Sequence, residues 1–433
     1  MYREKCTHAR GKREKVCIKK AFTKGAAHVI IQRKKGESMQ KFLYTDGDKI
    51  GVFDGEQCRL LESEYIVRYR ENAANRVKNG EWKYTGEGAR FRGDYDRFRE
   101  QNERVYAYIN GVQWAGDSVL YSFTVNGSSG VYRKEIANDA AREGHVITLN
   151  EKEICSIHCN GNSGLLAVTV RDGATSHIGI LDCATAELKT YTDGDARDEN
   201  PFFSATEADT VYFNSAGAGR LSDGSFSGRY SPSVVCKLNL QTLEITEVLK
   251  DRKLSYIKPK QDSAGNLYCI ERPNKEKSGG NPFVEIAMIP VRIVQAVVLF
   301  VQAFVTVFTG KSMTAGGENP AKGREQDSRK LYVDGNLIHA EKELKRNKRF
   351  KDKEYGFIPR SWKLVKFGED GKKQTLRAGV CDFALCDDGI YCTDGKHVLY
   401  LNEGGIKRVA TADMCLCVAA ESHGVPPTDV FQL

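Results

Sequence analysis

The chain has 433 residues, 40% hydrophobic and 28% charged, which is normal for a folded protein and too apolar for a disordered one. Its formal net charge is +8, and the positive charge is uneven, since residues 1–41 hold thirteen Lys or Arg against three Glu. Glycine is abundant, at 41 residues, and helix-like periodicity is scarce, which favours short strands joined by tight turns.

The amino terminus begins with basic residues and lacks the apolar run of a secretory signal. The thirteen cysteines are odd in number, and most stand inside apolar strand-like runs, as Cys269 does in NLYCIE. Extracellular disulfide frameworks instead place cysteines in the loops of small domains. We therefore expect a cytoplasmic protein whose thiols are reduced and buried. Residues 1–26 form a basic amino-terminal segment, which is most simply explained as solvated surface.

From about residue 108 a unit of roughly 40–50 residues recurs, which is the period of propeller blades. Its clearest copy covers residues 163–195, where LLAVTV alternates like a half-buried strand, RDG turns the chain, HIGILD forms the next strand and CATAE turns into LKTYT. Asp-Gly pairs, such as those at Asp172, Asp193, Asp334 and Asp370, supply the positive-φ glycine that two-residue hairpins need. The repeat therefore predicts a meander of antiparallel strands in each unit.

The two ends of the repeat region are predicted to meet in one blade. Residues 41–62 hold only the outer part of a blade, and MCLCVAA at 414–420 supplies the missing inner strand. The sequence thus predicts an all-β fold, a β-propeller of about six four-stranded blades at 27–420 with a carboxy-terminal tail at 421–433. Residues 62–107 are too polar to place, so a seventh blade stays open.

The segment ILDCATAELKTYTDGDARDENPFFSATEADTVYF resembles the repeat of TolB-like propellers. In that family a strand, a turn like ATAE, an outer strand and a DG step lead into an Asn-Pro-aromatic step and the next blade. Asn200, Pro201 and Phe202 stand at that step here. The resemblance covers roughly 250 residues, is strongest in the third and fourth blades, and implies the six-bladed fold without implying a shared exported function.

The fifth blade is interrupted by an insertion at residues 273–356. It contains a hydrophobic helix at 282–309, a flexible Gly-rich linker at 310–328 and a basic segment at 339–356, which we expect to form a charged helix. The hydrophobic helix is long enough to span a bilayer, but its polar residues fall within an arc of about 120°, so it is amphipathic. A single crossing would also place half of the propeller on the wrong side of the membrane.

We expect the apolar face of this helix to lie in the membrane interface or against a protein partner, and packing on its own propeller is the third possibility. The predicted contact residues are Ile293, Val297, Phe300, Val301, Phe304 and Phe308. Basic side chains in the following segment would support attachment to anionic lipid, namely Arg346, Lys348 and Arg349.

Catalytic motifs are absent from the sequence, which has no GxSxG elbow and no Walker or Rossmann loop. Cys155, His158 and Cys159 are spaced like metal ligands, but on a strand His158 points away from the two cysteines, and we interpret them as buried core residues. We predict no cofactor and no metal. Acids at the starts of blades could nevertheless hold a divalent ion, although hairpin and surface roles explain them equally well: Asp198, Glu199, Asp262 and Asp382.

The sequence therefore favours a non-enzymatic propeller scaffold for protein–protein interaction, attached through the inserted helix to a partner or to the inner face of the cell membrane. One alternative is a lactonase- or esterase-like hydrolase, which predicts convergent carboxylates and a divalent ion in the propeller channel. The other is a nucleic-acid-binding protein that uses the basic amino terminus, whose affinity would fall steeply with salt.

Overall fold

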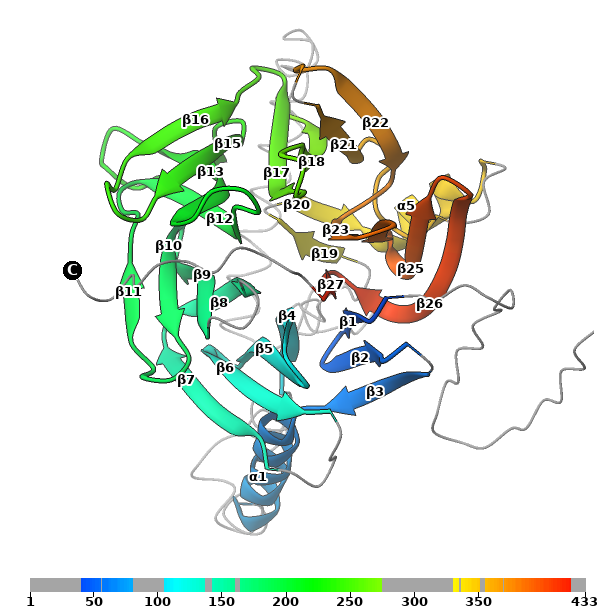
Figure 1. Ribbon diagram of the computed structural model, residues 1–433. Coiled ribbons are helices and arrows are strands. Elements are labelled where there is room, and N and C mark those ends of the chain that lie inside the picture. Colours follow the sequence, from blue (N-terminus) through cyan, green and yellow to red (C-terminus); the bar gives the residue numbers. More distant parts are fainter. Residues whose placement is uncertain are drawn as a thin grey trace, which may run out of the picture.

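The structure is a computed structural model that describes residues 40–55, 57–80, 105–136, 142–159, 164–274, 330–334, 336–350, 355–368 and 370–421 (Figure 1). These residues form an all-β fold with two helices, α1 (Glu64–Gly80) and α5 (Ala340–Asn347). The predicted basic segment at 1–26, the hydrophobic helix at 282–309 with its six contact residues, and the tail from 422 onwards lie outside the described residues.

Four antiparallel sheets contain four strands each. The first has the order β27-β1-β2-β3, with β27 (Val418–Ala420), β1 (Phe42–Asp46), β2 (Lys49–Phe53) and β3 (Cys58–Glu62). The second is β4 (Ala107–Ala115), β5 (Ser118–Val125), β6 (Ser128–Glu135) and β7 (Gly144–Asn150). The third is β17 (Leu254–Gln261), β18 (Leu267–Pro273), β21 (Lys363–Phe367) and β22 (Lys373–Ala378). The fourth is β23 (Asp382–Cys386), β24 (Gly389–Thr393), β25 (Gly395–Asn402) and β26 (Gly405–Cys415).

A larger, nine-stranded sheet contains two consecutive meanders. One consists of β8 (Glu153–Cys159), β9 (Leu165–Asp172), β10 (Thr175–Asp182) and β11 (Leu188–Thr190). The other consists of β12 (Ala196–Phe203), β13 (Thr210–Arg220), β15 (Val234–Asn239) and β16 (Ile245–Leu249), with β14 (Phe226–Tyr230) added to the end of β13. The pairing that joins the two meanders is parallel and holds a single residue pair, Ser176 with Arg197.

Figure 1 shows the sheets arranged in a ring, with β4, β8, β12, β17 and β27 near the centre and β3, β7, β16, β22 and β26 at the periphery. Radial antiparallel meanders of this kind define a β-propeller. The burial of the strands agrees with this arrangement, since every residue of β5 is buried whereas β16 is exposed along nearly all of its length.

Local sequence explains why the strands turn where they do. Val125 of β5 pairs with Ser128 of β6, so only Asn126 and Gly127 form the connection, and both have positive φ, 46° and 88°. Asparagine and glycine adopt these angles most readily, which is why an Asn-Gly pair between alternating strands makes a tight hairpin.

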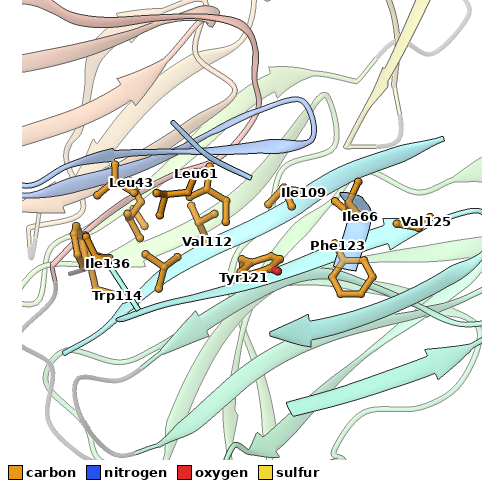
Figure 2. Packing of buried hydrophobic residues seen from close by; sticks show 14 residues of the cluster. Leu43, Leu61, Ile66, Ile109, Val112, Trp114, Tyr121, Phe123, Val125 and Ile136 are labelled. Atoms are coloured by element: carbon orange, nitrogen blue, oxygen red, sulfur yellow. The ribbon is translucent and has the colours of Figure 1, made fainter. Parts of the chain in front are cut away.

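The hydrophobic core lies between neighbouring sheets. Figure 2 shows Leu43 and Leu61 of the first sheet facing Val112 and Tyr121 of the second, all of them buried. Ile66 of α1 joins the same cluster. This helix occupies part of residues 62–107, which the sequence left unplaced, and no further blade is formed by its residues 64–80.

The first sheet contains strands from both ends of the described chain, because β27 pairs antiparallel with β1. The predicted inner strand at 414–420 is shorter in the structure, since Cys415 ends β26 and β27 contains only Val418–Ala420. Between them the chain bends toward β1, where the Thr45 Oγ1 atom accepts hydrogen bonds from the backbone N–H groups of Leu416 and Cys417, both at 3.1 Å.

The insertion separates two strands that pair directly, because Leu267–Glu271 of β18 lie opposite Lys363–Phe367 of β21. Its described part contains a hairpin of β19 (Lys330–Val333) and β20 (Asn336–His339), followed by α5. The charged helix expected over 339–356 was predicted too long, since α5 ends at Asn347. The buried Asn347 side chain donates from Nδ2 to the carbonyls of Gly356 and Ile358, at 2.9 and 3.0 Å, and so holds the returning chain against the end of α5. Neither of the helices that the structure describes is long and apolar enough to cross a bilayer.

Candidate functional site

The innermost strands carry a buried cluster of opposite charges. Lys258 and Lys260 belong to β17, Asp382 begins β23, and Asp334 lies in the turn between β19 and β20. The Lys258 Nζ atom is 3.6 Å from Asp334 Oδ2 and 3.8 Å from Asp382 Oδ1, and Lys260 Nζ is 3.5 Å from the same Asp382 oxygen. We call these four residues the central charge cluster.

Backbone groups complete the surroundings of the central charge cluster. Lys258 Nζ donates to the Leu416 carbonyl at 3.4 Å, and Lys260 Nζ donates to the Phe383 carbonyl. The Val418 N–H of β27 donates to Asp382 Oδ2 at 2.9 Å. The cluster therefore connects β17, β23 and the strand that completes the first sheet.

Both members of the Lys258–Asp382 pair are charged at neutral pH. Burial lowers the pKa of Lys258, but the carboxylates of Asp334 and Asp382 outweigh it and leave that pKa above its ordinary value. Burial raises the pKa of Asp382, yet Lys258 and Lys260 outweigh it in turn and leave the Asp382 pKa below its ordinary value. Such a lysine is a fixed cation and not a neutral amine nucleophile.

A strand irregularity places Lys258. The β17–β18 register shifts between Ile257 and Lys260, and Lys258 has a φ of 54° directly before a proline. The same arrangement occurs in β12, where Asn200, with a φ of 56°, precedes Pro201. Asn214 Oδ1 accepts a hydrogen bond from the Lys258 N–H at 3.1 Å, which fixes the irregular backbone against the neighbouring strand β13.

His158 is buried close to this region and is neutral. Burial lowers its pKa to about 3, and the positive charge of Lys260 acts in the same direction. Its Nδ1 accepts a hydrogen bond from the Phe203 N–H at 3.2 Å, and its ring lies 4.2 Å from that of Phe202. This partner explains His158 as an interblade contact.

The two cysteines near His158 are poor metal ligands in their present setting. Burial raises the pKa of the Cys155 thiol to about 12 and that of Cys159 to about 11, so both stay protonated at neutral pH. Across the described ranges no group of three or more His, Cys, Asp or Glu residues is placed to hold a metal ion.

A second set of polar residues runs across the face of the ring at which β4, β8 and β12 begin. Tyr108 Oη lies 3.5 Å from Glu153 Oε1, and Arg171 contacts Glu153 at 3.3 Å and Glu199 at 3.0 Å. Arg197 then binds both oxygens of Glu199, at 2.8 and 2.6 Å. The guanidinium carbon of Arg197 is 5.1 Å from the ring centre of Tyr230. We call this set the tyrosine–arginine chain: Tyr108, Glu153, Arg171, Glu199, Arg197 and Tyr230.

The tyrosine–arginine chain has a buried carboxylate on its inner side and exposed tyrosines on its solvent side. Glu199 is only 7% exposed, whereas Tyr108 is 39% exposed and the neighbouring Tyr106 is 50% exposed. Burial lowers the pKa of Arg171, but the negative charges beside it, among them the carboxylates of Glu199 and Glu153, outweigh burial and leave that pKa above its ordinary value. Charged and aromatic groups are thus held in fixed positions on a partly exposed face.

The four candidate acids each have partners of their own in the structure. Glu199 binds two arginines of the tyrosine–arginine chain and Asp382 two lysines of the central charge cluster. Asp262 accepts hydrogen bonds from the N–H groups of residues 264 and 266, which is the hairpin role that the sequence left open. Asp198 is buried, and burial raises its pKa.

Sequence reasoning missed most of both sites. A signal for one of them was present, because LSYIKPKQ places two lysines in an otherwise apolar strand. Arg171, Arg197, Tyr108 and Tyr230 stand in four different strands and carried no local signal.

The strand pairing places this chain in the class of β-propeller proteins. No known family and no curated protein matches its sequence. Among solved structures, TolB from Acinetobacter baumannii is similar over 89% of this chain and 67% of its own, with 9% identity and a TM-score of 0.45. A Lactobacillus plantarum protein is similar over 88% of this chain and 98% of its own, with 8% identity and a TM-score of 0.37.

A puromycin-hydrolyzing peptidase of Mycobacterium tuberculosis is similar over 40% of this chain, with 14% identity and a TM-score of 0.25. The matched region spans 27% of that peptidase, so most of its length has no counterpart here. A TolB, whose family the sequence resembles, is among these similar structures, and the assignment of this chain to the β-propeller class rests on its own strand pairing.

Proposed function

We propose that this protein is a six-bladed propeller scaffold that binds another protein through the face carrying the tyrosine–arginine chain. The blade number follows if the nine-stranded sheet is divided at the single Ser176–Arg197 pair, which gives two meanders and, with the other four-stranded sheets, six blades. The insertion then interrupts the fifth blade, between β18 and β21.

The tyrosine–arginine chain is the observation that carries the proposed binding function. Tyrosine and arginine are enriched among the residues that dominate binding energy, since each combines a large contact area with hydrogen-bonding groups. Here Arg171, whose side chain is 34% exposed, is held by Glu153 and Glu199 before any partner arrives, so little side-chain entropy is lost on binding. The buried Arg197 contributes indirectly, by fixing Glu199. Tyr106 and Tyr108 supply the exposed aromatic area.

Affinity capture with matched variants tests the binding face. The test variant carries Tyr106→Ser and Tyr108→Ser. The control carries Leu243→Ser and Ile245→Ser, which removes side chains of similar exposure, 60% and 49%, near the outer strand β16. A partner recovered by the parent and the control but not by the test variant, and then bound directly in purified form, supports the proposal. Equal recovery by all three proteins refutes it.

We further propose that residues 282–309 form an amphipathic helix that attaches the scaffold to an anionic membrane surface or to its partner. The narrow polar arc of the helix supports this proposal, as do the exposed basic residues of the segment after it, Arg346, Lys348 and Arg349. The test is flotation with anionic vesicles of the parent and of a variant in which a Gly/Ser linker replaces residues 282–310. Flotation of the parent alone supports membrane attachment, and flotation of neither protein leaves the partner as the attachment point.

A further inference from the structure

The hairpin of β19 and β20 reaches the innermost strands although it belongs to no blade. Val333 pairs with Asn336, so a two-residue loop remains, and its first residue, Asp334, has a φ of 43°. Figure 1 shows the hairpin beside the ring centre, between β17 and β23. The carboxylate of Asp334 is thereby brought to the buried Lys258, 3.6 Å away.

Strand pairing does not tie this hairpin to the ring, because among the described residues β19 and β20 pair only with each other. Arg272 donates from Nη1 to the Asp334 carbonyl at 2.7 Å, and Val333 and Ile338 pack in the cluster around Trp362. Displacing the hairpin would therefore break no strand ladder of a blade, and its cost would be the exposure of Val333 and Ile338, which are 4% and 3% exposed in place.

The ammonium group of Lys258 is held loosely for a buried charge. Its three oxygen neighbours, on Leu416, Asp334 and Asp382, lie at 3.4, 3.6 and 3.8 Å. Charge-assisted bonds are normally about 2.7–2.9 Å long, and the Arg197–Glu199 pair of this protein has that length. The oxygen that Asp334 presents to Lys258 is therefore one that a better-fitting anion can replace.

The charges at the site define what can replace the Asp334 carboxylate. With Asp334 in place, two ammonium groups face two carboxylates. Without it, Lys258 and Lys260 face Asp382 alone, and one positive charge remains in a poorly solvated position. A buried uncompensated charge is costly, so the site requires a single anionic group in exchange.

We propose that Lys258 and Lys260 form a carboxylate-binding site at the centre of the ring, and that Asp334 is its internal occupant, displaced when a carboxylate from an acidic peptide or a small organic acid binds. The hairpin then acts as a lid: it is closed when Asp334 occupies the site and displaced when an external carboxylate occupies it. This site is separate from the tyrosine–arginine chain, so it stands or falls independently of the proposed partner.

The test measures carboxylate binding to the full-length chain in three forms: parent, Asp334→Asn, and Asp334→Asn combined with Lys258→Met. Asparagine tolerates the positive φ of this turn, so the first substitution removes the charge and keeps the hairpin. Acetate and N-acetyl-aspartyl-glycine amide serve as probes. Their binding is detected as saturable broadening of their NMR signals, and chloride is adjusted at each probe concentration to keep the ionic strength constant.

Asp334→Asn is expected to bind acetate at least about tenfold more tightly than the parent, because the apparent affinity is the intrinsic affinity multiplied by the fraction of molecules in which Asp334 has left the site, here at most about one tenth. The added Lys258→Met substitution should abolish that binding. Tighter binding of the peptide than of acetate identifies an acidic peptide as the source of the carboxylate, and equal binding identifies a small acid.

A second variant guards against misfolding of the first. Arg272→Ala keeps the Asp334 carboxylate but removes the bond to its carbonyl and the contact of Arg272 with the Trp362 ring, so it should loosen the hairpin and also raise the affinity for acetate above that of the parent. The inference is overturned if neither Asp334→Asn nor Arg272→Ala binds acetate more tightly than the parent, or if chloride competes as well as acetate does.

Discussion

Replacing Asp382 by asparagine should destabilise the protein strongly, because the carboxylate is the shared partner of two buried lysines. The Asp382 side chain is 5% exposed and lies 3.5 Å from Lys260 and 3.8 Å from Lys258. Asparagine has nearly the same shape and keeps an oxygen for the Val418 N–H, which now donates at 2.9 Å. The substitution therefore removes charge and little else.

The expected loss follows from the cost of leaving a buried charge without its partner, about 3–5 kcal/mol. Lys258 retains Asp334, so the lower end of that range applies, about 3 kcal/mol, or roughly a hundredfold in the unfolding equilibrium. The matched control is Glu247→Gln, which removes the carboxylate of an exposed pair with Lys250. Exposed pairs contribute less than about 1 kcal/mol.

Urea denaturation at pH 7 provides the assay, with the unfolding slope checked for constancy between variants. The reasoning is refuted if Asp382→Asn costs no more than Glu247→Gln. The pH dependence of stability is an independent test. The Asp382 pKa is lowered in the folded protein. Its stabilising contribution is therefore present above the unfolded pKa of about 3.9 and is lost as pH falls through the folded pKa. The difference between parent and Asp382→Asn should therefore be constant from neutral pH to about pH 5 and close only below about pH 4.

Three further outcomes test the packing. Because the His158 pKa falls from an unfolded value of about 6.5 to about 3, acid costs stability, roughly 2 kcal/mol between pH 6.5 and 5, and His158→Gln should remove this part of the pH dependence in thermal melts. Gly395→Ala should cost more in urea than Gly405→Ala, since both have positive φ but only the former would place a methyl 2.6 Å from the Phe357 ring; equal costs would contradict the packing. Asn347→Ala leaves two carbonyls without their amide partner and should cost about 2–3 kcal/mol, seen as lost hydrogen-exchange protection in α5.

Local patterns were sufficient to predict the strands of a blade. The unit at 163–195 becomes β9, β10 and β11, with the turn after β9 at an Asp-Gly pair as expected. Asn200 and Pro201 fall within the innermost strand β12, at its register shift. These features follow from two-residue alternation and from the backbone freedom of glycine, which neighbours in sequence determine.

The candidate sites could not be predicted in the same way, because their residues meet only after the ring forms. Lys258, Asp334, Asp382 and Leu416 come from four separate segments, and no spacing in the sequence relates them. The end of α5 was missed for a related reason, since the Asn347 side chain at that end binds the carbonyls of residues 356 and 358. This contact with the returning chain is not visible in the local helical pattern.

The central charge cluster is more than a means of joining blades. At three places a side-chain oxygen of one meander accepts a hydrogen bond from a backbone N–H in the innermost strand of the following meander. The pairs are Thr169 with Asn200 at 3.1 Å, Asn214 with Lys258 at 3.1 Å and Asp382 with Val418 at 2.9 Å. A neutral threonine or asparagine accepts the hydrogen bond at the first two places, so a charged acceptor is not needed for the N–H at the third. Replacing a buried ion pair by neutral side chains is often neutral or stabilising, so stability alone does not explain two lysines and a carboxylate at this joint. The insertion brings Asp334 to the same place, which is what a site for exchanging one carboxylate against another requires.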